Sequence, residues 1–441
     1  MKLSQYKSFV LLFVALLSTG IMAAQTKEIT VDGLKIILKQ TPKDVVSVRL
    51  FIKGGTDNYT KAKEGVDALT LSLAVQGGTR TRDAVTYATE AEKIGTALGA
   101  DAQLEYSEIS MTCVKMFWDK SWDLFADAIL NPAFDAKEFG LIKEQFMANA
   151  MSSISDPDQH LKNLALRNAF KGTQYERIPD GSPEGIEGIT LDDVKAHYKK
   201  ILGKQRCFLV VVGNITEADL IAKVKATLAK MPFGTAYKPT PRTLITKGGI
   251  FIEDRDIATN YLRGMMSAPT RETAEGTVMQ LGMSILGSRF FVELRTKRSL
   301  SYAPAAFYSG GVLLNPYNTI YITTQDPKQS IQVMTDIINE IKKNGFQQSE
   351  LDDQKQMFLT QHYMGQQTTS EQSLTLGMYE IVGSWKLSEQ FPVNVNNTTL
   401  SELNKVFDKY TKAIQWTYLG KQAQVKQEDF KQTVEEKKKP Y

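Results

Sequence analysis

SEISMTCVKMFWDKSWDLFADAILNPAFDAKEF, residues 107–139, is matched in pattern by NTIYITTQDPKQSIQVMTDIINEIKKNGFQQSEL, residues 318–351. In each copy a strand pattern leads into an amphipathic helix, a turn that ends in phenylalanine, and the acidic start of a long helix. A second pair of stretches, residues 190–213 and 399–420, reads in both cases as a helix followed by a strand. Self-similarity at one offset indicates two duplicated domains.

The repeated unit predicts the fold class. Each half reads as an α+β unit in which helices cover one face of an antiparallel sheet. Two such units would face each other across a cavity. The predicted segments are a signal peptide at residues 1–24, an N-terminal domain at 25–232, a linker at 233–247, a C-terminal domain at 248–425 and a charged tail at 426–441.

The first residues have the features of a secretory signal peptide. Lys2 and Lys7 precede a short apolar run, residues 9–17, and small residues follow as far as Ala24. The sequence therefore predicts an exported protein, located in the periplasm of a bacterium. No later run is long and apolar enough for a transmembrane helix, and a net charge of +4 over 441 residues indicates no nucleic-acid partner.

Cysteines and histidines are few. Cys113 and Cys207 both lie in apolar strand-like runs, so buried free thiols are favoured, although one disulfide is also compatible with an exported chain. His160, His197 and His362 lie in helical stretches without a second His or Cys at ligand spacing. Each is expected to be a core or surface histidine rather than a metal ligand.

The stretch VELRTKRSLSY, residues 292–302, places Arg295 and Tyr302 seven positions apart. A guanidinium offers a planar fork of donors and a phenol offers one directional donor, so the two side chains could converge on one oxygen-rich ligand. The alternative is a solvated basic helix end. Lys297 and Arg298 are expected to be ordinary solvated charges.

Three features together resemble the inverzincin metallopeptidases, the family of pitrilysin, insulinase and mitochondrial processing peptidase. They are the duplicated halves, a helix that ends at Gly77-Gly78-Thr79, and the pattern L-R-x-K-x-x-L-x-Y over residues 294–302. The resemblance spans essentially the whole chain after the signal peptide. It implies two insulinase-like domains, of which the first carries the zinc-site positions and the second the arginine–tyrosine motif.

The zinc motif of that family, H-x-x-E-H, is absent. In the family the motif begins three residues after a glycine, and Glu on a later helix completes the site. Counted from Gly65, the corresponding positions are Ala68, Leu71, Ser72 and, for the third ligand, Asn149. Counting back from Thr79 shifts the register by one and gives Leu69, Ser72 and Leu73. Neither register offers a zinc-binding set, so no metal or other cofactor is expected in this chain.

The resemblance assigns Arg295 and Tyr302 to substrate binding across a zinc site that this chain does not contain. The predicted function is therefore a catalytically silent subunit of an exported heterodimeric zinc peptidase. The partner, a homologous H-x-x-E-H chain, would hold the zinc and cleave short or unfolded peptides, and this chain would be no enzyme by itself. The alternative is a non-hydrolytic structural or peptide-binding scaffold of the same fold.

Residues 100–106, ADAQLEY, correspond to the edge strand that takes substrate peptide by β-augmentation in this family. A plain sheet strand is the alternative interpretation.

Overall fold

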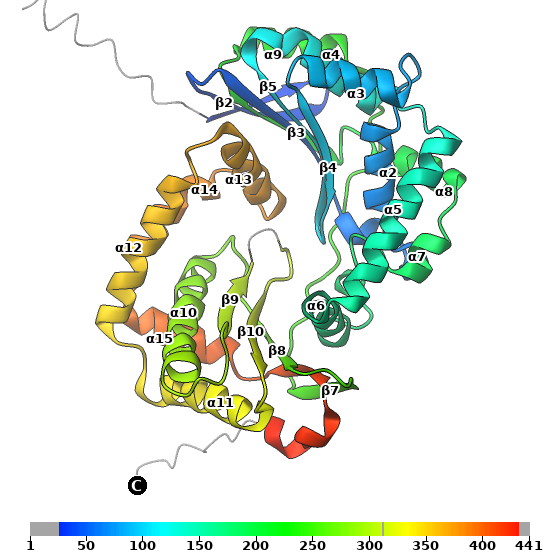
Figure 1. Ribbon diagram of the computed structural model, residues 1–441. Coiled ribbons are helices and arrows are strands. Elements are labelled where there is room, and N and C mark those ends of the chain that lie inside the picture. The colour runs from blue at the N-terminus through cyan, green and yellow to red at the C-terminus, as the bar shows by residue number, and fades with distance from the viewer. Residues whose placement is uncertain (1–25, 311–312, 432–441) are drawn as a thin grey trace, which may run out of the picture.

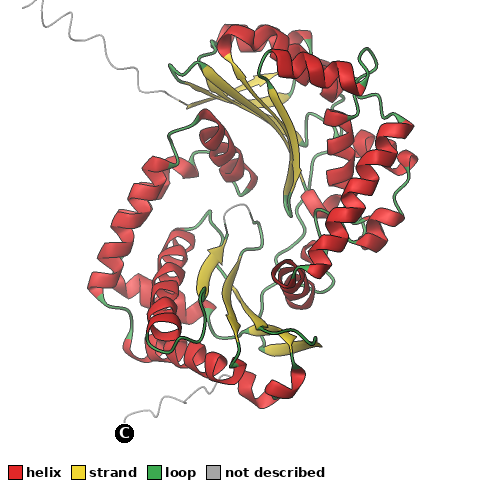
Figure 2. Ribbon diagram, viewed as in Figure 1, coloured by secondary structure: helices red, strands yellow, loops and turns green. Residues whose placement is uncertain are grey.

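A computed structural model describes residues 26–310 and 313–431 of the chain (Figure 1). The predicted signal peptide and residues 432–441 of the predicted tail lie outside the described residues. The chain forms two halves, each with one sheet and several helices (Figure 2). Among the described residues, no helix is long and apolar enough to cross a membrane.

The first half contains a six-stranded sheet in the order β1-β2-β6-β3-β5-β4. Its elements are β1 (Thr26–Val31), β2 (Leu34–Gln40), β3 (Val45–Lys53), α2 (Val66–Gln76), α3 (Ala84–Lys93), β4 (Ala97–Ala102), β5 (Tyr106–Val114), α4 (Trp118–Leu130), α5 (Ala136–Ser155), α6 (Pro157–Ala169), α7 (Pro183–Glu187), α8 (Leu191–Ile201), β6 (Cys207–Gly213) and α9 (Glu217–Ala226).

The second half contains a five-stranded sheet in the order β7-β11-β8-β10-β9. Its elements are β7 (Gly249–Asp254), β8 (Asn260–Ser267), α10 (Ala274–Phe290), the π-helical turn η6 (Phe291–Thr296), β9 (Ala305–Ser309), β10 (Tyr317–Thr324), α11 (Pro327–Asn344), α12 (Gln348–Met364), α13 (Thr369–Ile381), α14 (Leu387–Asn397), α15 (Leu400–Tyr410), β11 (Gln415–Gly420) and the short turn η8 (Gln427–Phe430).

The duplication predicted from the sequence is visible in the packing of equivalent aromatic residues. Phe134, in the turn between α4 and α5, packs edge-on against Tyr198 of α8 at 5.2 Å between ring centroids. Phe346, in the turn between α11 and α12, meets Phe407 of α15 in the same way at 5.0 Å. Tyr198 and Phe407 each stand eight residues after the threonine that caps their helix, so each half uses the same contact to join its helices.

Both sheets are mainly antiparallel, as expected, but each contains one parallel pair. Strand β6 runs parallel to β2, and β11 runs parallel to β7. Both β6 and β11 follow a long helical excursion, and such a connection can return the chain in the same direction as the earlier strand.

Within each half the helices cover one face of the sheet, as expected, and the opposite face of each sheet is covered by a helix from the other half. Helices α2, α4, α8 and α9 pack on one face of the first sheet. The opposite face contacts Leu376 and Ile381 of α13, which belongs to the second half. In return, Ala165 and Leu166 of α6, from the first half, pack on Met265 of the second sheet. Each half therefore lends one helix to the other (Figure 1).

Central strands read as continuous apolar runs because both of their faces are covered. Strand β6, CFLVVVG, is buried at every position. Cys207 at its start and Cys113 on β5 are both buried and unpaired, which answers the question that the sequence left open in favour of free thiols. Burial raises the pKa of the Cys207 thiol to about 12.

The segments at the predicted boundaries are packed onto the domains. The predicted linker is irregular, but Tyr237 and Thr240 both donate hydrogen bonds to Asp57, at 3.2 and 2.8 Å. The part of the predicted tail that the structure describes, residues 426–431, packs onto the second half. Phe430 in η8 is buried and packs edge-on against Trp416, because an aromatic side chain there can extend the core of the second half.

Candidate functional site

Helix α2 carries three of the positions that correspond to zinc-site residues. Ala68 and Leu71 are buried and Ser72 is half-buried. Leu71 belongs to the hydrophobic core that joins α2 to the first sheet. The fourth position, Asn149 on α5, is exposed, and its side-chain oxygen accepts a hydrogen bond from Gln145 at 3.0 Å. Alanine and leucine provide no donor atom, so this set does not fit a zinc ion.

The alternative register, which assigns the zinc motif to Leu69, Ser72 and Leu73, offers no zinc-binding set either. Leu69 and Leu73 are fully buried, and they share a hydrophobic cluster with Phe139, Ile142 and Phe146 of α5. The interface between α2 and α5 is therefore packed with apolar side chains at the positions that this register assigns to the zinc site. Among the described residues, no group of three or more His, Cys, Asp or Glu side chains is arranged to hold a metal ion.

The one carboxylate of α2 is used inside the fold. Asp67 is fully buried; its carboxylate lies 2.7 Å from Nε2 of His197 and accepts a hydrogen bond from the Ser107 hydroxyl at 2.7 Å. His160 on α6 lies 2.9 Å from the Glu253 carboxylate of β7. These two histidines therefore connect elements of the fold by pairing with carboxylates.

The third histidine, His362, packs against an aromatic ring of a neighbouring helix. The ring of His362 on α12 lies 5.4 Å from the ring of Phe391 on α14. Burial lowers the pKa of His362 from its usual value, and the nearby charge of Lys39 acts in the same direction.

Helix α10 ends in the π-helical turn η6, and this turn presents Arg295. The chain then bends at Ser299, whose φ of 53° lies in the left-handed region. The bend returns Tyr302 to the arginine, and Cζ of Arg295 lies 4.1 Å from the centroid of the Tyr302 ring. Cζ also lies 4.8 Å from the centroid of the Phe291 ring. Arg295 and Tyr302 are therefore in contact with each other, and their convergence on a shared ligand stays a prediction.

The stacked pair lies at the surface of the molecule. Tyr302 is 79% exposed and Phe291 is 45% exposed, while Arg295 is half-buried between the two rings. Within residues 26–310 and 313–431, no hydrogen bond or ion pair engages the Arg295 guanidinium. Its donors are thus free for a ligand, while the guanidinium keeps its contacts with the two rings.

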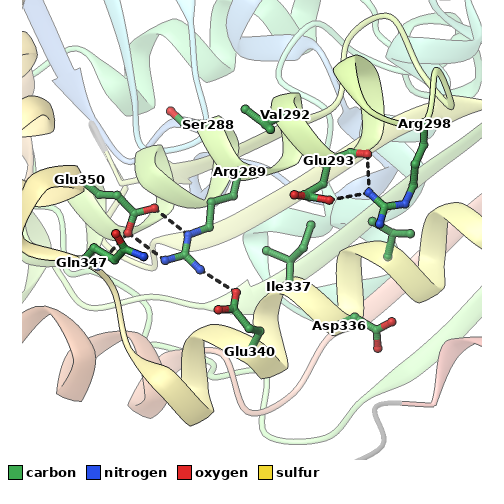
Figure 3. A pocket seen from close by; sticks show the side chains of 11 residues that line it. Ser288, Arg289, Val292, Glu293, Arg298, Asp336, Ile337, Glu340, Gln347 and Glu350 are labelled. Atoms are coloured by element: carbon green, nitrogen blue, oxygen red, sulfur yellow. Dashed lines mark hydrogen bonds and ion pairs between the residues drawn. The ribbon is translucent and has the colours of Figure 1, made fainter.

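The other basic side chains nearby have carboxylate partners (Figure 3). Lys297 binds Glu293 at 2.6 Å. Arg298 binds the same carboxylate at 2.5 Å. The hydrogen bond from Lys297 is the main reason that the pKa of the Glu293 carboxyl lies below its usual value, and the hydrogen bond from Arg298 acts in the same direction. Arg289 binds Glu340 at 2.7 Å and Glu350 through two bonds of 2.8 Å. Lys297 and Arg298 are both exposed, as predicted, and each pairs with Glu293 of the same turn.

These ion pairs line a groove between α10, η6 and α11, with a volume of about 550 Å³ (Figure 3). Its apolar floor includes Val292, Val333 and Ile337. Neither Arg295 nor Tyr302 lines this groove. The sequence did not single out Phe291, although its position four residues before Arg295 is the spacing of neighbours on a helix face.

Strand β4 occupies residues 97–102 and is the outermost strand of the first sheet, next to β5. The predicted edge strand, residues 100–106, therefore begins three residues and ends four residues later than the observed one. Residues 103–105 form the turn between β4 and β5, in which the Gln103 N–H donates a hydrogen bond to the Tyr106 carbonyl at 2.7 Å.

The fold and the substituted metal positions define a two-domain metallopeptidase architecture without its zinc ligands. Comparison with known proteins gives one consistent family. Residues 35–179 match the family described as Insulinase (Peptidase family M16), and residues 188–358 match the Peptidase M16 inactive domain. The chain belongs to peptidase family M16, the insulinase family, as the sequence motifs predicted, and it is similar to members that are not peptidases.

Two relatives and one solved structure illustrate the similarity. The non-peptidase homolog YmxG of Helicobacter pylori is 23% identical over 367 residues, which cover 81% of this chain and 83% of that protein. The mitochondrial-processing peptidase subunit alpha-1 of Dictyostelium discoideum is 23% identical over 226 residues, 49% of this chain and 34% of that protein. The crystal structure of a peptidase M16 inactive domain from Pseudomonas fluorescens superposes with a TM-score of 0.82 at 20% identity, over 90% of this chain and 98% of that one.

Proposed function

We propose that this chain is the catalytically silent subunit of an exported heterodimeric zinc peptidase. Its partner is a homologous chain that carries H-x-x-E-H, holds the zinc and cleaves short or unfolded peptides. This chain contributes Arg295 and Tyr302 to the composite substrate site. The observation that carries the proposal is a free, stacked guanidinium–phenol pair in a chain whose metal positions are Ala68, Leu71, Ser72 and Asn149.

The chemistry of the pair supports a role beside a reacting peptide bond. A guanidinium binds a peptide carbonyl or carboxylate, and a phenol donates toward an oxyanion. Such donors act on catalysis only when a nucleophile faces them, and the residues at the zinc-motif positions of this chain do not form a set that could bind a metal and its water. The exposure of Tyr302, outside the groove beside α10, suits contact with a second chain.

Two further features fit a peptide ligand. Strand β4 has one unpaired edge, so an extended peptide could add to the sheet there through main-chain hydrogen bonds. The predicted signal peptide places the complex outside the cytoplasm, in the periplasm of a bacterium. One similar protein is named as the alpha-1 subunit of a peptidase, which is in line with a two-subunit arrangement.

The experiment is reconstitution with a homologous H-x-x-E-H chain from the same organism. The mixture is expected to cleave an unfolded peptide. Arg295→Ala should lower kcat/KM by a factor that corresponds to a loss of about 1.5–3 kcal/mol of transition-state binding. This is the usual effect of losing a hydrogen bond from a charged group. Tyr302→Phe should also lower turnover. Both variants should still co-elute with the partner in size-exclusion chromatography.

Arg298→Ala is the matched control, because Arg298 lies on the same turn and is occupied by Glu293. It should leave turnover within twofold of the unmodified complex, a threshold of about 0.4 kcal/mol. If the two chains associate but Arg295→Ala has no more effect than Arg298→Ala, the proposed role of the pair fails. If no activity appears although they associate, the non-hydrolytic scaffold becomes the better account.

A further inference from the structure

The groove between α10, η6 and α11 is not part of the proposed substrate site, because neither member of the arginine–tyrosine pair lines it. Its volume of about 550 Å³ lies in the range of pockets that bind ligands. The apolar floor is open to solvent, since Val292 is 44% exposed and Val333 is half-buried. The groove therefore suits an occupant that brings an apolar side chain.

The lining of the groove has more carboxylates than cations. Both of its arginines are already bound by carboxylates of the same groove, and Lys297 joins Glu293 from outside the lining. The charged residues that line the groove are Glu293, Asp336, Glu340 and Glu350, against Arg289 and Arg298. The groove therefore carries a net negative charge.

The excess negative charge lies on the wall that α11 forms. Asp336 and Glu340 stand four residues apart and so share one face of this helix. The side chain of Glu340 binds Arg289 and is still 53% exposed. Asp336 is exposed and accepts a hydrogen bond from Gln332 at 2.8 Å, and within the described ranges no cation pairs with it. This wall therefore offers two carboxylates to a cationic occupant.

The chain itself contains a segment with matching chemistry. Residues 432–441, QTVEEKKKPY, lie outside the described structure. Three consecutive lysines, Lys437–Lys439, complement the acidic wall of the groove. Tyr441, two residues after the last lysine, offers an apolar ring for the floor.

The segment can reach the groove. The described chain ends just after η8, which packs against α11 (Figure 1). Helix α11 has 18 residues and is about 27 Å long at 1.5 Å per residue. Ten extended residues span up to about 33–36 Å, more than the length of this helix. A tethered segment also has an effective concentration in the millimolar range, which favours it over a free peptide of the same composition.

We infer that residues 432–441 bind in the groove between α10, η6 and α11 of the same chain. Lys437–Lys439 lie against the carboxylates of Asp336 and Glu340, and Tyr441 covers the apolar floor at Val292. This inference goes beyond the proposed function and does not depend on it, because it involves neither the zinc-bearing partner nor the arginine–tyrosine pair.

Disulfide trapping in the full chain tests this contact. The native cysteines are buried, so engineered surface thiols react selectively. One variant combines Pro440→Cys with Ser288→Cys, at an exposed position that lines the groove. The matched control combines Pro440→Cys with Lys328→Cys, at an exposed position of α11 that does not line it. Under mild oxidation the groove pair is expected to form its intramolecular disulfide about tenfold faster than the control pair.

Charge exchange tests what holds the segment. Added to the groove pair, Asp336→Lys should slow disulfide formation toward the rate of the control, and Lys438→Glu should do the same. The two substitutions together should restore part of the rate, because the charges are then exchanged. Salt at 1 M, where the Debye length is about 3 Å, should also slow the groove pair.

The inference is overturned if the groove pair and the control pair form their disulfides at the same rate, or if neither charge substitution slows the groove pair. It is also overturned if the disulfide joins two chains at a rate that rises with protein concentration, because the occupant is then the segment of a second copy. Failure of the proposed function would appear in turnover of the reconstituted complex and would leave these rates unchanged.

Discussion

Glu105 is a carboxyl group buried at the contact between the two halves. It is 1% exposed, and it accepts hydrogen bonds from the Tyr175 hydroxyl and from the Leu314 N–H, the latter at 3.0 Å. The Tyr175 oxygen in turn accepts from the Asn315 N–H at 2.9 Å. Burial raises the pKa of Glu105 to about 8, so the carboxyl is neutral in the folded protein across much of the physiological range.

Stability should therefore fall as the pH rises. Between the unfolded pKa, near 4.5, and the folded pKa, about 8, the native state holds a proton on Glu105 that the unfolded state has lost. The free energy of unfolding should decrease across this window by at most about 1.4 kcal/mol per pH unit for this group. Glu108, whose pKa burial raises to about 7, acts in the same direction.

Urea denaturation between pH 5.5 and 8 measures this dependence. Glu105→Gln imitates the neutral carboxyl and keeps an acceptor for Leu314, so it should flatten the pH dependence and be more stable than the unmodified chain at pH 8. Glu92→Gln, at an exposed position on α3, is the control. A Glu105→Gln variant whose stability changes with pH as steeply as the control would contradict the assignment.

Sequence reasoning at the residue scale worked where spacing carried the signal. The motif count identified Ala68, Leu71 and Ser72, which the structure places together on α2. The seven-residue interval suggested that Arg295 and Tyr302 could act on one ligand, and the structure places these two side chains in contact with each other. Glu105 could not be found in this way. Its burial depends on Leu314, about 200 residues away, and a glutamate before a strand reads as an ordinary surface residue.

At the scale of elements, the contact of α13 with the first sheet depends on one glycine. A Cβ added to Gly377 would lie 2.0 Å from the Phe51 ring, far inside van der Waals contact. The helix can approach the sheet this closely only without a side chain at that point. By contrast, Gly140 on α5 has nothing within 4 Å of an added Cβ.

The same substitution in these two helices should therefore have opposite effects. Gly377→Ala should destabilise the protein by about 1–3 kcal/mol, because the ring or the helix must move. Gly140→Ala should stabilise it by about 0.5–1 kcal/mol, through a better helix propensity and a smaller entropy loss on folding. Chemical denaturation of both variants checks the pair. Equal effects of the same sign would contradict the close packing of α13.

The elements themselves were largely predictable, but their partners were not. The period of apolar residues predicted the strand–helix–helix units at residues 107–154 and the buried strand β6. An amphipathic pattern shows that a helix buries a face and does not say on which sheet. The exchange of α6 and α13 between the halves therefore had no counterpart in the sequence.

At the scale of the whole molecule, the exchanged helices tie the two halves together. Trp385, just after α13, donates a hydrogen bond to Glu28 of β1 at 3.0 Å, and His160 of α6 lies beside Glu253 of β7. The duplicated architecture follows from the internal repeat. An interface with a second chain could not be predicted in the same way, because a single sequence contains no pattern that identifies the surface residues of such an interface.

The central claim is that this chain supplies substrate-binding groups and the partner supplies the zinc. It is tested most directly by measuring the zinc content and the peptide hydrolysis of this chain alone, of its H-x-x-E-H partner and of their mixture, by metal analysis and a peptide cleavage assay. The account predicts no stoichiometric zinc and no cleavage for this chain alone, and zinc-dependent cleavage for the mixture above that of the partner. Zinc-dependent cleavage by this chain alone would contradict it.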